Sequence, residues 1–523
     1  MKTTKLISHF FINYIECTFQ YRYQLLVLFL ICRYAIYSTN GLWTEDFWEH
    51  SAVVRELMSH PLNPAHPQLQ INATHAFFTP YALLVAAVGW VLHTDAITTL
   101  ALFGLINLTF LCVSLRLFIA TIDSKYTNSI TFYTLILMLF LWGNDGWQFS
   151  SFYSFEGLNS VLPYPSSFAI ALSFIGLAVH SKQLKQFSIA SQIALIFICA
   201  TVLITHSLTA IFLIAGIGCQ TLCIAKFGKI DILKDALAIA CAVLLTFTWP
   251  YFSMRELMTG AGDAYNYSNR SMYLAVFDRI WPTFLTLPII FTQATQPKSR
   301  SLGLTMLCLI FIYIGGYFSM KYSYGRSIAF ILLVSNILLA QSIVRFESTM
   351  FKSTSAAFIF KVILVFILTL SAIIWLKQNV SRFLTVANSI HLGRPISSQI
   401  TYKDLLFISN YTQQGDLVLA DVERSWIIPA IGGKVIATDH PLAFFPNWYN
   451  RKLQLIEFFN PETSPERREE IFNTYHPNFL LITKPNNSNW MVIVKQFTTE
   501  DKGIKVFEDH NYVLLEFKST QKN

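Results

Sequence analysis

Three carboxylates and a histidine lie within six residues near the start of the chain, in the stretch LWTEDFWEH at 42–50. If this stretch is helical, Asp46 and His50 share one face, and Glu45 and Glu49 share the neighbouring face. A carboxylate held beside a hydroxyl group can take its proton while the oxygen attacks. The stretch therefore contains candidates for a general base, although acidic residues in a first helical turn can also simply complement the helix dipole.

Further polar side chains accompany this stretch. Trp43 and Trp48 lie within it beside the carboxylates, and His75 follows in the same long polar segment. Asp145 opens a second polar segment, WGNDGWQFSSFYSFEG at 142–157, in which the Gly-Asn-Asp-Gly run also fits a simple turn. The side chains that we expect to bind an acceptor or to assist the base are those of Glu49, His50, His75 and Asp145.

The elements that must hold these residues are mostly membrane helices. Of the 523 residues, 54% are hydrophobic and 13% are charged, whereas a soluble domain is roughly 25% charged. The net charge of +8 comes from short basic clusters scattered between apolar runs. Because nucleic-acid-binding proteins gather such charges on one face, the composition indicates a polytopic membrane protein without a nucleic-acid partner.

Eleven apolar runs predict membrane-spanning helices. Basic residues occur in alternate connections, which places the N-terminus in the cytoplasm and the long loop 41–97 outside. Lys125 must then be inside, so 77–93 is expected to lie as a helix at the outer interface rather than to cross. The C-terminus is outside in this topology, and a twelfth crossing is the alternative. The runs are 23–40, 98–119, 129–143, 166–180, 188–205, 208–225, 236–252, 278–293, 302–319, 327–344 and 356–376.

The composition changes after the last of these runs to that of a soluble α/β domain. Ser464 and Pro465 predict the start of a helix that continues to residue 475. We therefore divide the chain into a membrane module at 1–376, which includes the first outer loop, and an extracytoplasmic α/β domain at 377–523. The strands predicted in this domain lie at 416–421, 434–439, 479–484 and 511–517.

This layout resembles that of the GT-C superfamily of integral membrane glycosyltransferases, which use polyprenyl-phosphate-linked sugars. The resemblance rests on a first membrane helix followed by the acidic pair in TED at 44–46, a long outer loop, many further crossings and an outer α/β tail. It implies that an acidic residue of the first loop is the catalytic base, which corresponds by position to Asp46, with Glu45 second. Protein O-mannosyltransferases and aminoarabinose transferases carry a His-Pro-Pro-Leu-like stretch before the interfacial helix. The corresponding NATHAFFTPYALL at 72–84 has a single proline, which leaves the subfamily open.

A leaving phosphate needs cations or hydrogen-bond donors. Arg326, in YSYGRSIAF at 322–330, lies at the outer start of an apolar run, and Arg33 lies inside the first crossing, where a charge is unusual. The resemblance implies a basic residue facing the lipid phosphate, so both arginines are candidates to bind it. The alternative for each is an arginine that snorkels to the membrane surface.

The resemblance predicts an inverting, multi-pass glycosyltransferase of the plasma (inner) membrane. Its expected partners are a polyprenyl-phosphate sugar donor, membrane lipid, and a glycan, lipid or protein acceptor. No cofactor is assigned, and a divalent metal stays open because spacing alone does not define a site. The alternatives are a transporter or flippase of a lipid-linked glycan, an O-antigen polymerase or ligase, and a non-catalytic membrane scaffold. Transporters favour polar residues deep in the bundle, and a scaffold leaves the cluster at 44–50 unexplained.

Overall fold

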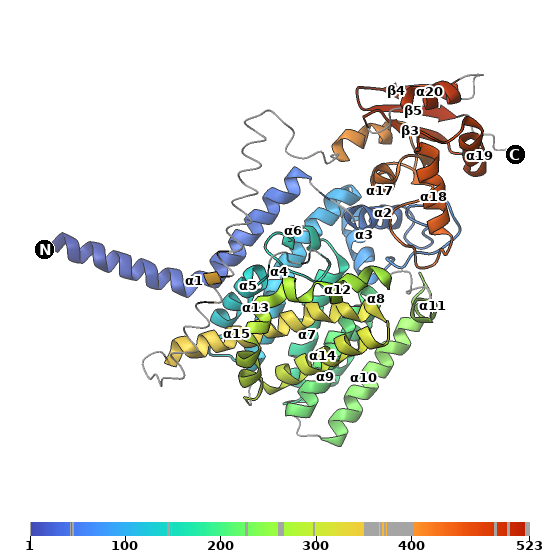
Figure 1. Ribbon diagram of the computed structural model, residues 1–523. Coiled ribbons are helices and arrows are strands. Elements are labelled where there is room, and N and C mark those ends of the chain that lie inside the picture. Colours follow the sequence, from blue (N-terminus) through green and yellow to red (C-terminus); the bar gives the residue numbers. More distant parts are fainter. Residues whose placement is uncertain are drawn as a thin grey trace. The chain divides into compact units, whose positions relative to one another are not determined.

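The computed structural model divides the chain into two compact units (Figure 1). The first comprises residues 1–40, 103–248 and 266–398, and the second comprises residues 41–102, 249–265 and 399–523. The residues that the structure describes are 2–41, 43, 46–143, 147, 149–224, 228–259, 266–296, 299–349, 366, 369–370, 373, 402–485, 489–498 and 503–517.

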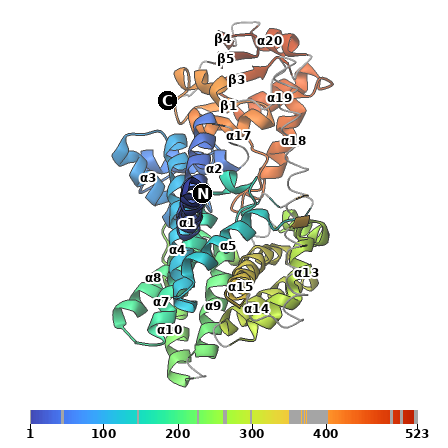
Figure 2. The ribbon, with the colours of Figure 1, turned by 90° about the vertical axis from the view of Figure 1, so that its left-hand side faces the viewer.

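Apolar helices make up the first unit (Figure 2). Ten of the eleven predicted apolar runs correspond to helices, and the eleventh, 356–376, lies almost entirely outside the described residues. The helices are α1 (Lys2–Asn40), most of α4 (Ala96–Ile122), α5 (Thr127–Phe140), α7 (Pro165–Gln183), α8 (Ile189–Thr205), α9 (Ser207–Ile224), α10 (Lys229–Phe247), α13 (Val276–Ala294), α14 (Arg300–Phe318) and α15 (Ser327–Thr349).

Several of these helices are suited to a membrane. Within the described part of the chain, four helical segments are both long and apolar enough to cross one: Ala96–Ile122, Ser207–Ile224, Arg300–Phe318 and Tyr322–Phe346. The pair Ser268–Leu274 and Val276–Ala294, bent by 48°, makes a fifth if it is counted as one span. The mostly helical, membrane-type fold is thus confirmed, while the number of eleven crossings stays a prediction.

Close packing and buried polar contacts hold the first unit together. Gly104 of α4 lies against Tyr34 of α1, and any side chain at 104 would overlap the tyrosine; small residues permit such close approach of membrane helices. The Nδ1 of His180 in α7 lies 2.7 Å from Oε1 of Gln220 in α9, and its Nε2 lies 3.1 Å from Oδ1 of Asp235 in α10. This buried network joins three helices.

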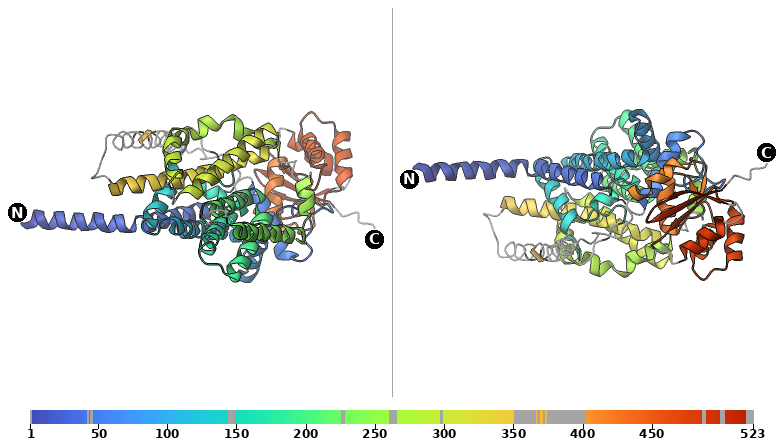
Figure 3. Two further views of the ribbon diagram at one scale, coloured as in Figure 1. Left: turned by 90° about the horizontal axis from the view of Figure 1, so that it is seen from below. Right: turned by 90° about the horizontal axis from the view of Figure 1, so that it is seen from above.

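A five-stranded sheet forms the centre of the second unit (Figure 3). In the order β2-β1-β3-β5-β4, β1 is parallel to β2 and β3, whereas β5 is antiparallel to β3 and β4. The sequence predicts four of these strands and misses β4, whose residues GIKVFE are largely exposed and carry a lysine and a glutamate. The strands are β1 (Leu417–Leu419), β2 (Lys434–Val435), β3 (Phe479–Thr483), β4 (Gly503–Glu508) and β5 (Tyr512–Phe517).

Helices α18 (Trp448–Phe459), α19 (Pro465–Tyr475) and α20 (Trp490–Thr498) bury one face of this sheet. Alternate residues of β3, Leu480 and Ile482, share a core cluster with Phe458 and Phe497, as expected when side chains alternate between the faces of a strand. Helix α19 has the predicted bounds, because the side chain of Ser464 accepts a hydrogen bond from the amide of Arg467 and proline occupies the first turn.

The first long loop belongs to the same unit as the C-terminal sheet. Its helix α2 (Asp46–Ser59) packs against α17 (Val422–Ile431). Leu69 forms a parallel bridge with Val435, whose amide donates to the carbonyl oxygen of Gln68 at 2.8 Å. The sequence-based division assigns 41–97 to the membrane module, whereas the structure packs this loop against residues of the tail.

The segment predicted to lie at the membrane interface is a helix, α3 (Pro80–Leu92). Thr79 caps it by accepting a hydrogen bond from the amide of Ala82. Two large apolar side chains near its end, Trp90 and Val91, are exposed in the second unit. These features suit an interfacial helix, and its position at a membrane surface stays a prediction.

Candidate functional site

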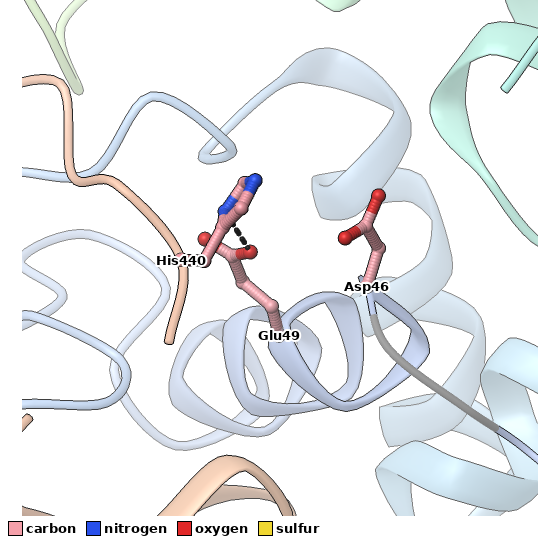
Figure 4. A group of neighbouring side chains, drawn as sticks. All are labelled: Asp46, Glu49 and His440. Atoms are coloured by element: carbon pink, nitrogen blue, oxygen red, sulfur yellow. Dashed lines mark ion pairs between the residues drawn. The ribbon is translucent and has the colours of Figure 1, made fainter. Parts of the chain in front are cut away.

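The site begins at the first turn of α2, where Asp46 and Glu49 point to the same side of the helix (Figure 4). Trp43 stacks on Phe47 with ring centroids 4.2 Å apart, which fixes this end of the helix. Glu49 is fully buried, whereas Asp46 is half-buried. Of these two carboxylates, that of Asp46 is therefore the one that a ligand from solvent can reach.

Glu49 lies between two histidines that come from distant parts of the sequence. Its Oε1 is 3.1 Å from Nε2 of His75, and its Oε2 is 2.7 Å from Nδ1 of His440. Burial alone would raise the pKa of Glu49, but His440 and His75 outweigh it and keep the pKa well below the ordinary value of 4.5. Glu49 is thus an anion held in place, not a proton carrier at neutral pH.

Backbone hydrogen bonds fix the rings of His75 and His66. The amide of Phe77 donates to Nδ1 of His75 at 3.2 Å, and the amide of Leu69 donates to Nδ1 of His66 at 3.0 Å. Because an amide can only donate, each Nδ1 carries a lone pair and the proton of the neutral ring lies on Nε2. His75 therefore presents an N–H to Glu49. Burial keeps the pKa of His66 well below its ordinary value, so this ring is neutral at neutral pH.

His50 follows Glu49 on α2 and is almost fully buried. Its ring stacks on that of Phe77, with centroids 4.7 Å apart. Burial lowers the pKa of His50 to about 4, although Asp46 and Glu49 act in the opposite direction. His50 is therefore neutral at physiological pH, and one face of its ring is occupied by phenylalanine.

Two turns beyond Glu49, a buried ion pair ties α2 to the sheet. Glu56 Oε2 lies 2.6 Å from Nζ of Lys434 in β2, and Gln414 Nε2 donates to the same oxygen at 2.8 Å. Arg55 donates to the carbonyl oxygens of Pro429 and Gly432. These contacts hold the carboxylates of α2 in a fixed position relative to the segment that carries His440.

His440 belongs to the site although the sequence analysis does not identify it. It follows β2 in the segment TDHP at 438–441. Ligand-binding residues gather beyond the carboxyl ends of strands in sheets with parallel strands, and β1 and β2 are parallel. This general rule is the signal that could have pointed to His440, because nothing in the local sequence distinguishes it.

Asp46, Glu49 and His440 form a set of side chains that could hold a metal ion. Each offers one ligand atom, and the three atoms lie within 4.8 Å of one another. Figure 4 shows the imidazole of His440 against the carboxylate of Glu49, with Asp46 one turn of α2 away. Of the residues predicted for the site, Asp46, Glu49, His50 and His75 are thus brought together.

The remaining predicted site residues fall elsewhere. Glu45 and Asp145 lie outside the described residues. Arg326 and Arg33 lie in the first unit. Arg326 donates from Nε to Asn269 at 2.8 Å and from a terminal nitrogen to Ser150 at 2.7 Å. Arg33 donates to Asn159 at 3.1 Å, and its guanidinium lies 4.0 Å from the centroid of the Phe155 ring.

Comparison with known proteins gives a fold. No protein-family model and no curated protein sequence matches the chain. Among solved structures, the chain is similar to the oligosaccharyltransferase of Archaeoglobus fulgidus tethered with an acceptor peptide containing the NVT sequon. The TM-score is 0.51 and the identity 10%, over 89% of this chain and 69% of the archaeal one.

Two further structures are similar to a lesser degree. ArnT from Cupriavidus metallidurans matches with a TM-score of 0.47 and 10% identity, over 94% of this chain and 97% of ArnT. The arabinofuranosyltransferase AftD from mycobacteria matches with a TM-score of 0.49 and 10% identity, over 92% of this chain and 40% of AftD. The likeness to the archaeal enzyme confirms the GT-C fold that the sequence layout predicts.

Proposed function

We propose that this chain is a membrane glycosyltransferase that moves a sugar from a polyprenyl-phosphate donor to an acceptor hydroxyl, with Asp46 as the general base. The observation that carries the proposal is the position of Asp46. Its half-buried carboxylate stands on a fixed helical turn, in the first loop of a chain with the GT-C fold. Catalysis by positioning requires a base held in this way, because a misplaced base loses most of its effect.

The neighbouring groups are less suited to be the base. Glu49 is fully buried and contacts two imidazoles, so an acceptor cannot reach it. His50 is almost buried and its ring lies on Phe77. A base must come within hydrogen-bond reach of the proton that it takes, and of the described residues in this cluster Asp46 meets this condition best.

The proposed reaction is a displacement at the anomeric carbon of the donor. The acceptor oxygen forms a bond to this carbon as the bond from the carbon to the phosphate oxygen breaks. Asp46 takes the proton of the acceptor hydroxyl, and the polyprenyl phosphate leaves with the electron pair of the broken bond. Attack from the face opposite the phosphate inverts the anomeric configuration.

We propose that Arg326 binds the leaving phosphate, with Arg33 as the second candidate. Hydrogen bonds to Asn269 and Ser150 orient the guanidinium of Arg326 at the start of α15, and a guanidinium can bind two phosphate oxygens at once. Replacing Arg326 by lysine keeps the charge but removes this bidentate geometry. We expect Arg326→Lys to raise the KM for the donor more than it lowers kcat, measured by varying donor concentration.

The site is proposed to face the outside of the plasma membrane. The first loop and the tail share one compact unit, which supports their being on the same side of the membrane. The basic residues in the alternate connections favour the cytoplasm for the opposite side. The acceptor is then a glycan, lipid or protein that is present outside the cytoplasm.

The test is sugar transfer in membranes that contain the full-length protein at matched expression. A panel of labelled polyprenyl-phosphate sugars is offered to wild type, Asp46→Asn, Glu45→Gln and Glu462→Gln, the last an exposed glutamate of the tail. Loss of a general base typically lowers the rate by about 10²- to 10⁴-fold. We expect such a loss in Asp46→Asn, and near wild-type transfer in the other two variants.

The outcomes separate the alternatives. Equal transfer by wild type and Asp46→Asn would remove Asp46 as the base, and loss confined to Glu45→Gln would give that role to the neighbouring residue. Absence of transfer by wild type with every donor would favour the transporter and scaffold alternatives over an enzyme.

A further inference from the structure

We infer that a cavity close to Arg326 receives an acylamino group of the donor sugar, and that Asn336 and Ser151 recognise this group through hydrogen bonds. The donor is then a polyprenyl-phosphate sugar with an acetamido substituent next to its anomeric carbon. This assignment rests on the proposed function and involves residues of the first unit alone.

The cavity lies between the end of α5, the segment 149–157 and α15. Its empty space amounts to about 230 Å³, including the part that is open to the outside. The amide of Phe155 donates to the carbonyl oxygen of Leu139 at 2.9 Å, which brings the segment back along the end of α5. Trp142, which lines the cavity, is held by a 2.7 Å hydrogen bond from its indole to the carbonyl oxygen of Met138.

Helix α15 supplies one wall of the cavity. Four of its residues line the space, and their spacing places them on one face of the helix. They are Ala329, Leu332, Leu333 and Asn336. The segment Tyr322–Phe346 is apolar enough to cross a membrane, and a polar side chain inside such a helix is costly unless it has a partner. Asn336 is therefore the residue of this wall that needs an explanation.

Two polar groups of the lining have no such partner. The Oγ of Ser151 is buried and lacks a hydrogen-bond partner among the described residues. Asn336 is 6% exposed, and its side chain makes no hydrogen bond within the described part of the chain. Ser151 also has a φ of 76°, a left-handed conformation that costs free energy in serine. Because buried polar groups are nearly always paired, we expect the partner to come from a ligand or from water.

The lining favours a neutral ligand group that is partly apolar. None of the described residues around the cavity is charged, so a phosphate or an amine would be buried there without a counter-charge. An acetamido group offers one N–H and one carbonyl oxygen, and the amide of Asn336 can pair with both. The hydroxyl of Ser151 can donate to the same carbonyl, while the methyl group contacts Leu332 and Phe152. An isoprenoid chain would leave both polar side chains unpaired.

The position of the cavity relates it to the donor sugar. Ser151 directly follows Ser150, whose hydroxyl accepts a hydrogen bond from Arg326 at 2.7 Å. If the leaving phosphate is bound by Arg326, the substituent next to the anomeric carbon is the one on the sugar ring that lies nearest to it. This substituent therefore reaches the cavity more readily than the more distant hydroxyl groups do.

The test compares two donors that differ only in this substituent, polyprenyl-phosphate N-acetylglucosamine and polyprenyl-phosphate glucose. Binding of each donor to the full-length protein in detergent is measured by competition with a labelled polyprenyl phosphate, and sugar transfer is followed in parallel. We expect wild type to bind the acetamido donor about 10-fold more tightly, because two or more hydrogen bonds to buried groups are gained.

Variants assign this preference to the cavity. Asn336→Leu removes the amide at similar volume and should weaken binding of the acetamido donor about 10-fold, with little effect on the glucose donor. Ser151→Gly removes the hydroxyl at a backbone conformation that suits glycine, so it should unfold no earlier than wild type while the preference falls. The matched control is Asn450→Leu, which removes an exposed amide of the tail and should keep the full preference.

The outcomes separate this assignment from the proposed function. Equal affinity of wild type for the two donors would overturn the assignment and leave the cavity to water, whether or not sugar is transferred. A preference that persists in both Asn336→Leu and Ser151→Gly would also overturn it. Preferential binding without transfer of either sugar would support the cavity assignment and contradict only the proposed activity.

Discussion

The Nζ of Lys434 and the Oε2 of Glu56 lie 2.6 Å apart, although 378 residues separate them in the sequence. Both side chains are buried, and Lys434 also donates to the carbonyl oxygens of His66 and Pro67. The lysine of β2 therefore holds the first loop in two places. The helix that carries Asp46 is fixed to the sheet by this contact rather than by sequence proximity.

Removing the lysine should destabilise the second unit. In Lys434→Met, Glu56 stays buried with the donors Gln414 and Ala65 but without a cation, and breaking a buried ion pair from one side costs about 3–5 kcal/mol. We expect a clearly lower thermal midpoint for the full-length protein in detergent, followed by tryptophan fluorescence. Lys505→Met, which removes a half-exposed lysine of β4, is the control and should shift the midpoint little.

Replacing both partners tests the origin of this loss. The double variant Glu56→Leu with Lys434→Met removes both buried charges, so it should be more stable than Lys434→Met alone. If the single lysine variant unfolds at the wild-type midpoint, the pair contributes nothing measurable and the contact is incidental.

The same pair predicts a dependence of stability on pH. Burial alone would raise the pKa of Glu56, but Lys434, Gln414 and the amide of Ala65 lower it below the ordinary value of 4.5. A carboxyl whose folded pKa is depressed stabilises the fold above its unfolded pKa and loses this contribution as the pH falls through the folded value. Wild type should therefore lose stability below about pH 4.5 more steeply than Glu56→Gln.

Other carboxylates also titrate in this range, so the comparison of slopes is the measurement. Thermal midpoints are recorded from pH 7 downwards for wild type, Glu56→Gln and Glu462→Gln, an exposed control. Glu462→Gln should follow wild type. Parallel curves for wild type and Glu56→Gln would show that the pKa of Glu56 does not change on folding.

The sequence predicts those helices whose formation depends on residues only a few positions apart. Ser464 and Pro465 mark the start of α19 because a cap and a first-turn proline act within four residues. The helical spacing at 44–50 likewise predicts α2, although it assigns Asp46 and Glu49 to neighbouring faces and the structure points both to one side. The apolar runs predict helices for the same reason, because whether a segment can span lipid depends on its own length and apolar composition.

Relationships between distant segments were not predictable in this way. The contacts of His440 with Glu49 and of Lys434 with Glu56 each join the first loop to the tail, and neither tail residue carries a local signature. Strand β4 has a charged, exposed face, so its pattern differs little from that of a loop. The boundary drawn after residue 376 follows composition, whereas the compact units follow tertiary contacts.

The last prediction uses two glycines of the tail that differ in their surroundings. A Cβ at Gly433 would overlap the carbonyl oxygen of Asp416, whereas no described atom lies within 4 Å of one placed at Gly415. The overlap is with backbone, so β2 must move away from β1 and the 2.7 Å hydrogen bond from the Lys434 amide to Asp416 must lengthen. We expect Gly433→Ala to cost about 2 kcal/mol or more.

Gly415→Ala should instead be neutral or stabilise the fold by up to about 1 kcal/mol, because alanine restricts the unfolded chain. Thermal midpoints of the two variants give the comparison. Equal midpoints for the two variants would mean that β1 and β2 are not packed as closely as the structure places them.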